Sequence, residues 1–127
     1  MRRVLVVEDD SLVRGLLRRM LTEAGYQAES RENADSALAA LDLRVKEWDV
    51  VVSDYRLPGI SGLSFLEQVR ARHPHVRVVL MSAYLTDDVE EQARACGAVG
   101  VLRKPFSFSE LKTLLRSLEE KSEPQPA

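Results

Sequence analysis

Hydrophobic and polar residues follow two alternating patterns along this chain, and each pattern predicts one kind of element. Apolar runs rich in β-branched residues, without polar interruption, are typical of strands buried on both faces of a parallel sheet. On this basis we expect five strands, the second of them short and weak. They lie at residues 4–7, 26–30, 49–53, 76–81 and 98–103.

Between the strands, apolar residues recur every three or four positions, which is typical of helices that bury one face. In the first helix, Arg14, Arg18 and Arg19 lie on the opposite, polar face. Residues suited to helix ends support the pattern, since Asn33 can cap the second helix and Ser107 begins a capping box in the last. The helices are expected around residues 12–21, 34–41, 63–69, 86–95 and 107–118.

Five strands that alternate with five helices predict an α/β fold, in which helices cover both faces of a parallel sheet. Right-handed crossovers restrict this fold to a doubly wound sheet with a crevice where the strand order reverses. The length of 127 residues suits one domain, which we expect over residues 1–120. Residues 121–127 contain two prolines and no hydrophobic pattern, so we expect a flexible tail or the start of a linker there.

The charge balance argues against a general attraction to nucleic acid or membranes, because 18 basic and 20 acidic residues leave a net charge of −2. No apolar stretch is long enough to span a bilayer, and the first residues do not form a signal peptide. The single cysteine, Cys96, excludes an internal disulfide and is typical of a reducing compartment, so we expect a cytoplasmic protein. We interpret Cys96 as a small buried residue, Trp48 as a packing residue, and His73 and His75 as surface residues.

Charged residues directly follow three of the expected strands. Glu8, Asp9 and Asp10 come after the first strand, Asp54 after the third, and Lys104 after the fifth. The carboxyl ends of parallel strands meet at one edge of the sheet, where α/β folds bind their ligands. Carboxylates gathered there repel one another and favour a hard cation such as Mg²⁺. The pattern therefore predicts a magnesium-dependent phosphoryl site.

Four segments at strand ends also carry a family resemblance, which covers the chain from about residue 3 to residue 119. The segments are Val6–Asp10, Ser53–Gly62, Met81–Ala83 and Lys104–Phe106. In this order, they resemble the receiver domain of bacterial two-component response regulators. The resemblance implies a flavodoxin-like receiver fold with strand order 2-1-3-4-5. It also implies a signalling phosphoacceptor and not an enzyme, since its only chemistry would be its own phosphorylation and dephosphorylation.

The resemblance implies a phosphoacceptor and a set of metal ligands. Asp54 matches the carboxylate that takes the phosphoryl group from a phosphohistidine of a histidine kinase. Glu8 and Asp9 match the acidic pair that binds Mg²⁺, with Asp54 and the backbone carbonyl of Arg56 as further ligands. Asp10 is better explained as the cap of the first helix than as a metal ligand.

The resemblance also implies two residues that respond to the phosphoryl group. Lys104 matches the lysine that contacts a phosphoryl oxygen, and the Lys104–Pro105 bond is expected to be cis. Ser82 matches the hydroxyl that moves toward the phosphoryl group and pulls the following loop with it. This movement would switch a protein-interaction surface.

Two features depart from the common family pattern. Val101 occupies the position, three residues before the lysine, where many receivers carry a phenylalanine or tyrosine that reports phosphorylation. Arg56 and Tyr84 lie two residues after Asp54 and Ser82. We hypothesise that Arg56 and Tyr84 set the lifetime of the acyl phosphate by controlling the access of water, which requires at least one of Arg56→Ala and Tyr84→Ala to change the dephosphorylation rate.

The expected partners are a sensor histidine kinase or phosphotransfer protein, and either a downstream target protein or a missing output domain. A homodimer that depends on phosphorylation is a further candidate. We see no helix-turn-helix or basic stripe, so we expect no direct binding of nucleic acid. Two alternatives stay open. One is a degenerate receiver that binds partners without phosphorylation, and the other is a flavodoxin-like enzyme or nucleotide binder, although no glycine-rich loop follows the first strand.

Overall fold

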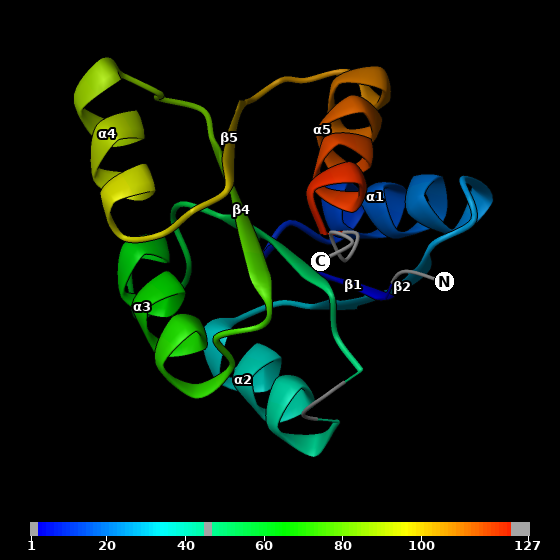
Figure 1. The fold of residues 1–127 in the computed structure, drawn as a ribbon, viewed down its shortest axis with the longest axis horizontal. Helices are drawn as coiled ribbons and strands as arrows, with labels where there is room; N and C mark the ends of the chain where they lie inside the picture. The colour runs from blue at the N-terminus through cyan, green and yellow to red at the C-terminus, as the bar shows by residue number, and fades with distance from the viewer. Residues whose placement is uncertain (1–2, 45–46, 123–127) are drawn as a thin grey trace, which may run out of the picture.

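The computed structural model describes residues 3–44 and 47–122. Across these residues the strands pair in parallel in the order β2-β1-β3-β4-β5, so the predicted α/β fold and strand order are confirmed (Figure 1). Within this part of the chain, no helix combines the length and apolarity needed to cross a bilayer. The elements are β1 (Arg3–Val7), α1 (Ser11–Glu23), β2 (Gln27–Arg31), α2 (Ala34–Leu43), β3 (Val50–Asp54), α3 (Gly62–Arg72), β4 (Arg77–Ser82), α4 (Asp87–Ala95), β5 (Gly100–Arg103) and α5 (Phe108–Ser122).

Helices cover both faces of the sheet, with α1 and α5 on one face and α2, α3 and α4 on the other (Figure 1). Successive residues of a strand point to opposite faces, so β1 contributes to both cores. Val4 and Val6 pack with residues of α1 and α5, whereas Leu5 and Val7 pack with residues of α2 and α3. Burial on both faces explains why the central strands are uninterrupted apolar runs.

The helix ends follow the predicted capping residues. Asp10 accepts hydrogen bonds from two backbone amides of α1, and Asn33 accepts one from α2. Ser107 Oγ accepts from the Glu110 amide over 3.1 Å, as a capping box requires. The proposed domain boundary after residue 120 falls inside α5, while residues 123–127 lie outside the described residues. This boundary therefore stays a prediction.

The expectation that His73 lies on the surface was wrong. Only 2% of the residue is exposed, and its Nε2 lies 2.8 Å from Asp42 Oδ1. His73 directly follows α3, and α2 supplies the carboxylate that makes its burial tolerable. His75 is exposed, and Trp48 is a buried packing residue, both as expected. Cys96 is only half-buried.

Candidate functional site

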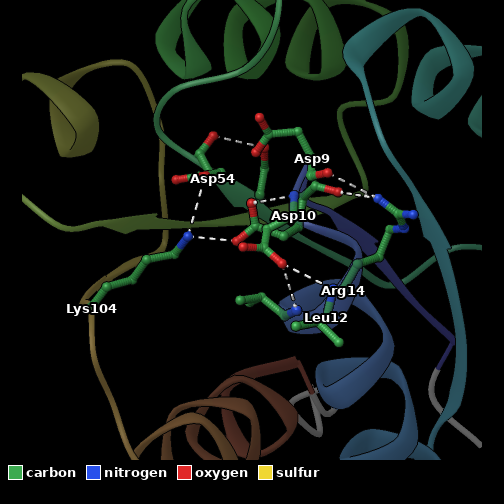
Figure 2. Close-up of polar contacts among 9 residues, drawn as sticks. Asp9, Asp10, Leu12, Arg14, Asp54 and Lys104 are labelled. Atoms are coloured by element: carbon green, nitrogen blue, oxygen red, sulfur yellow. Dashed lines mark hydrogen bonds and ion pairs between the residues drawn. The ribbon is translucent and has the colours of Figure 1, made fainter.

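Three carboxylates meet at the carboxyl edge of the sheet. Strands β1 and β3 are neighbours, and their register pairs Val7 with Ser53. The next residues, Glu8 and Asp54, therefore leave the sheet side by side, with Asp9 one residue further on. Oxygen atoms of Glu8, Asp9 and Asp54 all lie within 4.8 Å of one another. The structure thus brings together the three carboxylates expected to bind the metal, two of which, Asp9 and Asp54, are labelled in Figure 2.

Lys104 reaches this cluster from the end of β5. Its Nζ lies 2.5 Å from Glu8 Oε1 and 3.2 Å from Asp54 Oδ2 (Figure 2). Its backbone amide donates to the Ser82 carbonyl over 2.8 Å, which ties the start of the β5–α5 connection to the end of β4. The Lys104–Pro105 peptide bond is cis, as expected.

The ammonium of Lys104 stabilises a buried carboxylate. Only 1% of Glu8 is exposed, and an unpaired charge at such a position is strongly unfavourable. Burial by itself would lower the pKa of Lys104. The hydrogen bond to Glu8 and the negative charges of Asp54 and Glu8 outweigh that effect, so the pKa of Lys104 is raised above its usual value. Lys104 is therefore a firmly charged partner of both carboxylates.

The donor set fits a divalent hard cation. Three carboxylates and one ammonium give the cluster a formal charge of −2. Mg²⁺ and Ca²⁺ prefer oxygen ligands, and carboxylates are their most common protein ligands. Glu8, Asp9 and Asp54 could each supply one such oxygen. The site could therefore hold one divalent cation whose charge matches that of the cluster.

Ser82 lies at the end of β4, one residue beyond Met81, which pairs with Asp54 at the end of β3. Its hydroxyl is buried and accepts a hydrogen bond from the Tyr84 amide over 3.2 Å. The β4–α4 loop, residues 83–86, is also held from β5, because the Arg103 guanidinium donates to the Leu85 carbonyl over 2.8 Å. The hydroxyl of Ser82 thus stabilises the conformation of its own loop in this structure.

Arg56, in the β3–α3 loop, contacts Tyr84, in the β4–α4 loop, beside the cluster. The Arg56 guanidinium carbon lies 5.6 Å from the centre of the Tyr84 ring, within the range of a cation–π contact. Tyr84 is 73% exposed, so the pair lies at the solvent side of the site. The metal-ligand role expected of the Arg56 carbonyl stays a prediction. Val101 is half-buried against the core beneath α2, α3 and α4.

The contact made by Arg14 was not predicted from the sequence. This arginine was expected on the polar face of the first helix, but its side chain is half-buried and bonds the loop after β1. Its guanidinium donates to the backbone carbonyls of Glu8 and Asp9 over 2.9 and 3.3 Å (Figure 2). The sequence feature that could have indicated this contact is the position of Arg14, one helical turn after the N-cap Asp10.

An apolar groove lies directly beside the cluster, between α1 and the β5–α5 connection. Its volume is about 310 Å³. Lys104 lines the groove and also contacts Glu8 and Asp54, so the groove and the charged site share this residue. The lining residues are Val13, Leu16, Leu17, Met20, Ala83, Lys104, Pro105, Phe106 and Phe108.

Fold and site together define a class: a doubly wound α/β protein with an acidic, lysine-paired site at the carboxyl edge of its sheet. Residues 4–116 match the family profile of the response regulator receiver domain. The chain therefore belongs to the receiver domain family of two-component response regulators, as its motifs indicated.

Individual relatives agree with this assignment. The chain is similar to the DNA-binding transcriptional regulator NtrC of Salmonella typhimurium, with 40% identity over 112 residues, which are 88% of this chain and 24% of that protein. It is also similar to sporulation initiation phosphotransferase F of Bacillus subtilis, with 30% identity over 115 residues and 90% of each chain covered. The chain spans about a quarter of the length of the NtrC relatives.

A solved structure supports the same fold. The response regulator protein TrrA of Thermotoga maritima, determined in complex with Mg²⁺-BeF, matches with a TM-score of 0.80 and 33% identity. The match covers 93% of this chain and 99% of that chain.

Proposed function

We propose that this receiver domain is a phosphoacceptor in which Asp54 receives a phosphoryl group in a magnesium-dependent reaction. The observation that carries the proposal is the convergence of Glu8, Asp9 and Asp54 within 4.8 Å, with Lys104 bonded to two of them. Family membership and the Mg²⁺-BeF complex of the TrrA protein support it.

In the proposed reaction, an Asp54 carboxylate oxygen attacks the phosphorus of a phosphohistidine on a partner protein. The new O–P bond forms as the P–N bond breaks, and the imidazole nitrogen leaves with the electron pair. The product is an acyl phosphate on Asp54. Glu8, Asp9, Asp54 and the Arg56 carbonyl would hold Mg²⁺, which supplies charge neutralisation between the carboxylate and the incoming phosphoryl group.

Lys104 and Ser82 would respond to the new group. The Lys104 ammonium would exchange Asp54 Oδ2 for a phosphoryl oxygen, which can form a strong charge-assisted hydrogen bond. The Ser82 hydroxyl would exchange the Tyr84 amide for another phosphoryl oxygen. Because the Tyr84 bond holds the β4–α4 loop, its loss would free the loop to move and transmit the signal. The Arg56–Tyr84 pair would control the access of water to the acyl phosphate.

The phosphoryl donor would be a sensor histidine kinase or a phosphotransfer protein, and we place one of its helices in the apolar groove beside Lys104. Lys104 belongs to both the groove and the proposed reaction site, so a helix seated in the groove could carry a phosphohistidine to Asp54. Leu16, which lines the groove and is 53% exposed, offers a test. Leu16→Ser should slow transfer from a protein donor but not from acetyl phosphate. Leu43→Ser, on the exposed face of α2, should change neither.

On the output side, the proposed partner is either an output domain joined to the receiver, in keeping with the length of the NtrC relatives, or a separate target protein, in keeping with the length of sporulation initiation phosphotransferase F. The proposed signal would reach either one through the β4–α4 loop.

Intact mass after incubation with acetyl phosphate and Mg²⁺ tests the phosphoacceptor role. We expect an adduct of ~80 Da on the wild-type protein with Mg²⁺, and no adduct on Asp54→Ala or in EDTA. An adduct that persists in Asp54→Ala would assign the acceptor to another residue. If the wild-type protein shows no adduct in acid-quenched samples, a spectral change with beryllofluoride would indicate rapid hydrolysis. The lack of both responses would favour a degenerate receiver.

A further inference from the structure

The acidic loop, which we define as residues 8–10, connects β1 to α1 and is anchored at both ends. The Glu8 amide donates to a carbonyl at the end of β2 over 3.1 Å. The Asp10 carboxylate accepts from two backbone amides in the first turn of α1. Between these anchors, Asp9 is exposed, so packing does not hold its side chain in one direction. The direction of its carboxylate depends mainly on the backbone.

Arg14 holds the backbone on both sides of Asp9. Its Nη1 donates to the Glu8 carbonyl over 2.9 Å and to the Asp9 carbonyl over 3.3 Å (Figure 2). These two carbonyls belong to the peptide planes that flank the Asp9 Cα. Because each peptide plane is rigid, fixing both planes restricts the φ and ψ angles of Asp9. Those angles set the direction in which the side chain leaves the backbone.

Glu8 needs this restraint much less. Its side chain is buried, and its carboxylate bonds Lys104 over 2.5 Å. Packing and the ion pair therefore hold Glu8 in place without help from α1. Loss of the Arg14 contacts would mainly affect Asp9.

We infer that Arg14 is a positioning residue for the cation site, because it holds the Asp9 backbone so that the Asp9 carboxylate faces those of Glu8 and Asp54. This inference rests on the proposed function, since it gives Arg14 a part in binding Mg²⁺. Arginine suits the task because its planar guanidinium offers several donors in a fixed arrangement, whereas lysine offers a compact point charge.

Because Arg14 is positively charged, its positioning effect on Asp9 can be distinguished from its direct electrostatic effect on Mg²⁺. A positive side chain near the cluster repels Mg²⁺, so removing its charge should strengthen binding if charge alone matters. If positioning matters more, removing the side chain should weaken binding. The two explanations therefore predict changes of opposite sign.

Calorimetric titration with Mg²⁺ should compare the wild-type protein with Arg14→Gln, Arg14→Lys and Arg18→Gln. We expect Arg14→Gln to bind roughly tenfold more weakly, which is the size of effect seen when residues that orient metal ligands are lost. Arg14→Lys keeps the charge but not the paired contact, so its affinity should be intermediate. Arg18 is an exposed arginine one turn further along α1, and Arg18→Gln should bind as the wild type does.

A second readout needs no metal. In the metal-free protein, the backbone NMR order parameter of Asp9 should fall in Arg14→Gln and stay unchanged in Arg18→Gln. If the wild-type protein binds Mg²⁺ and Arg14→Gln binds it equally well or more tightly, the inference is overturned and the proposed function is not. A wild-type protein that does not bind Mg²⁺ would overturn the proposed function and this inference with it. If Arg14→Gln does not fold, wild-type affinity in Arg14→Lys overturns the inference instead.

Discussion

Replacing Asp9 with asparagine should make the metal-free protein more stable and the magnesium-bound protein less stable than the wild type. A carboxylate oxygen of Asp9 lies within 4.8 Å of carboxylate oxygens of Glu8 and Asp54. Asparagine has nearly the same size as aspartate, so the substitution changes the charge and little else. The substitution removes repulsion from two carboxylates and a weaker attraction to Lys104. In the absence of metal, the lost repulsion should dominate.

The magnitude follows from the separation of the charges. Two like charges 4.8 Å apart in a water-like dielectric repel by about 0.9 kcal/mol. Asp9 meets two carboxylates and one ammonium, and the attraction to the ammonium offsets at most one of the two repulsions, so at least one such repulsion remains. Asp9 is exposed, which justifies the high dielectric. We therefore expect Asp9→Asn to gain about 1 kcal/mol of unfolding free energy in EDTA.

Magnesium should reverse this order. A ligand present at 100 times its dissociation constant stabilises the folded state by about 2.7 kcal/mol. Loss of one of three carboxylate ligands should remove most of this gain from Asp9→Asn. The wild-type protein should then be the more stable of the two in saturating Mg²⁺.

Urea unfolding followed by tryptophan fluorescence can measure both values. Trp48 is the single tryptophan, is only 2% exposed, and precedes β3 at the strand end opposite Asp54. Asp10→Asn is the matched control, because it removes the same charge one residue away while asparagine caps a helix as well as aspartate does. The control should keep its full response to Mg²⁺. Charge repulsion as the cause is refuted if Asp9→Asn is no more stable than the wild type in EDTA, and metal binding at Asp9 is refuted if Mg²⁺ stabilises Asp9→Asn as much as the wild type.

Two further predictions concern the lysine and the glycines. Lys104→Gln should destabilise the protein by roughly 1–3 kcal/mol, because it leaves the buried Glu8 carboxylate without its cation. The pKa of Lys104 is raised in the folded state, so its stabilising effect is complete below pH 10.5 and declines as the pH rises through the folded-state pKa. The difference between the urea midpoints of the wild type and Lys104→Gln should therefore shrink above pH 10.5, and a constant difference would contradict this. Gly62→Ala should cost about 1–3 kcal/mol, since a Cβ there would lie 2.6 Å from a backbone carbonyl oxygen. Gly15→Ala, an exposed helical position where a Cβ meets nothing within 4 Å, should instead stabilise by roughly 0.5–1 kcal/mol, and equal effects at both glycines would disprove the steric explanation.

Much of the fold was already determined by local patterns in the sequence. Uninterrupted apolar runs marked the strands because a central parallel strand is buried on both faces. Asp10 and Asn33 marked helix starts because a capping side chain bonds amides within the same turn. The grouping of Glu8 with Asp54 was predictable for a related reason, since the carboxyl ends of parallel strands share one edge of the sheet.

Only the tertiary structure decided which side chains touch across that edge. Lys104 and Glu8 are 96 residues apart in sequence, and their pairing depends on the strand order and on the rotamers that packing allows. His73 is buried because a carboxylate from a different helix lies next to it, which no local pattern reveals. In the sequence, Arg14 resembles the other solvated arginines of its helix, but the fold brings two backbone carbonyls within hydrogen-bond distance of its guanidinium. Hydrophobic periodicity is a local property and survives in the sequence, whereas the direction of a polar side chain is set by neighbours that only folding brings together.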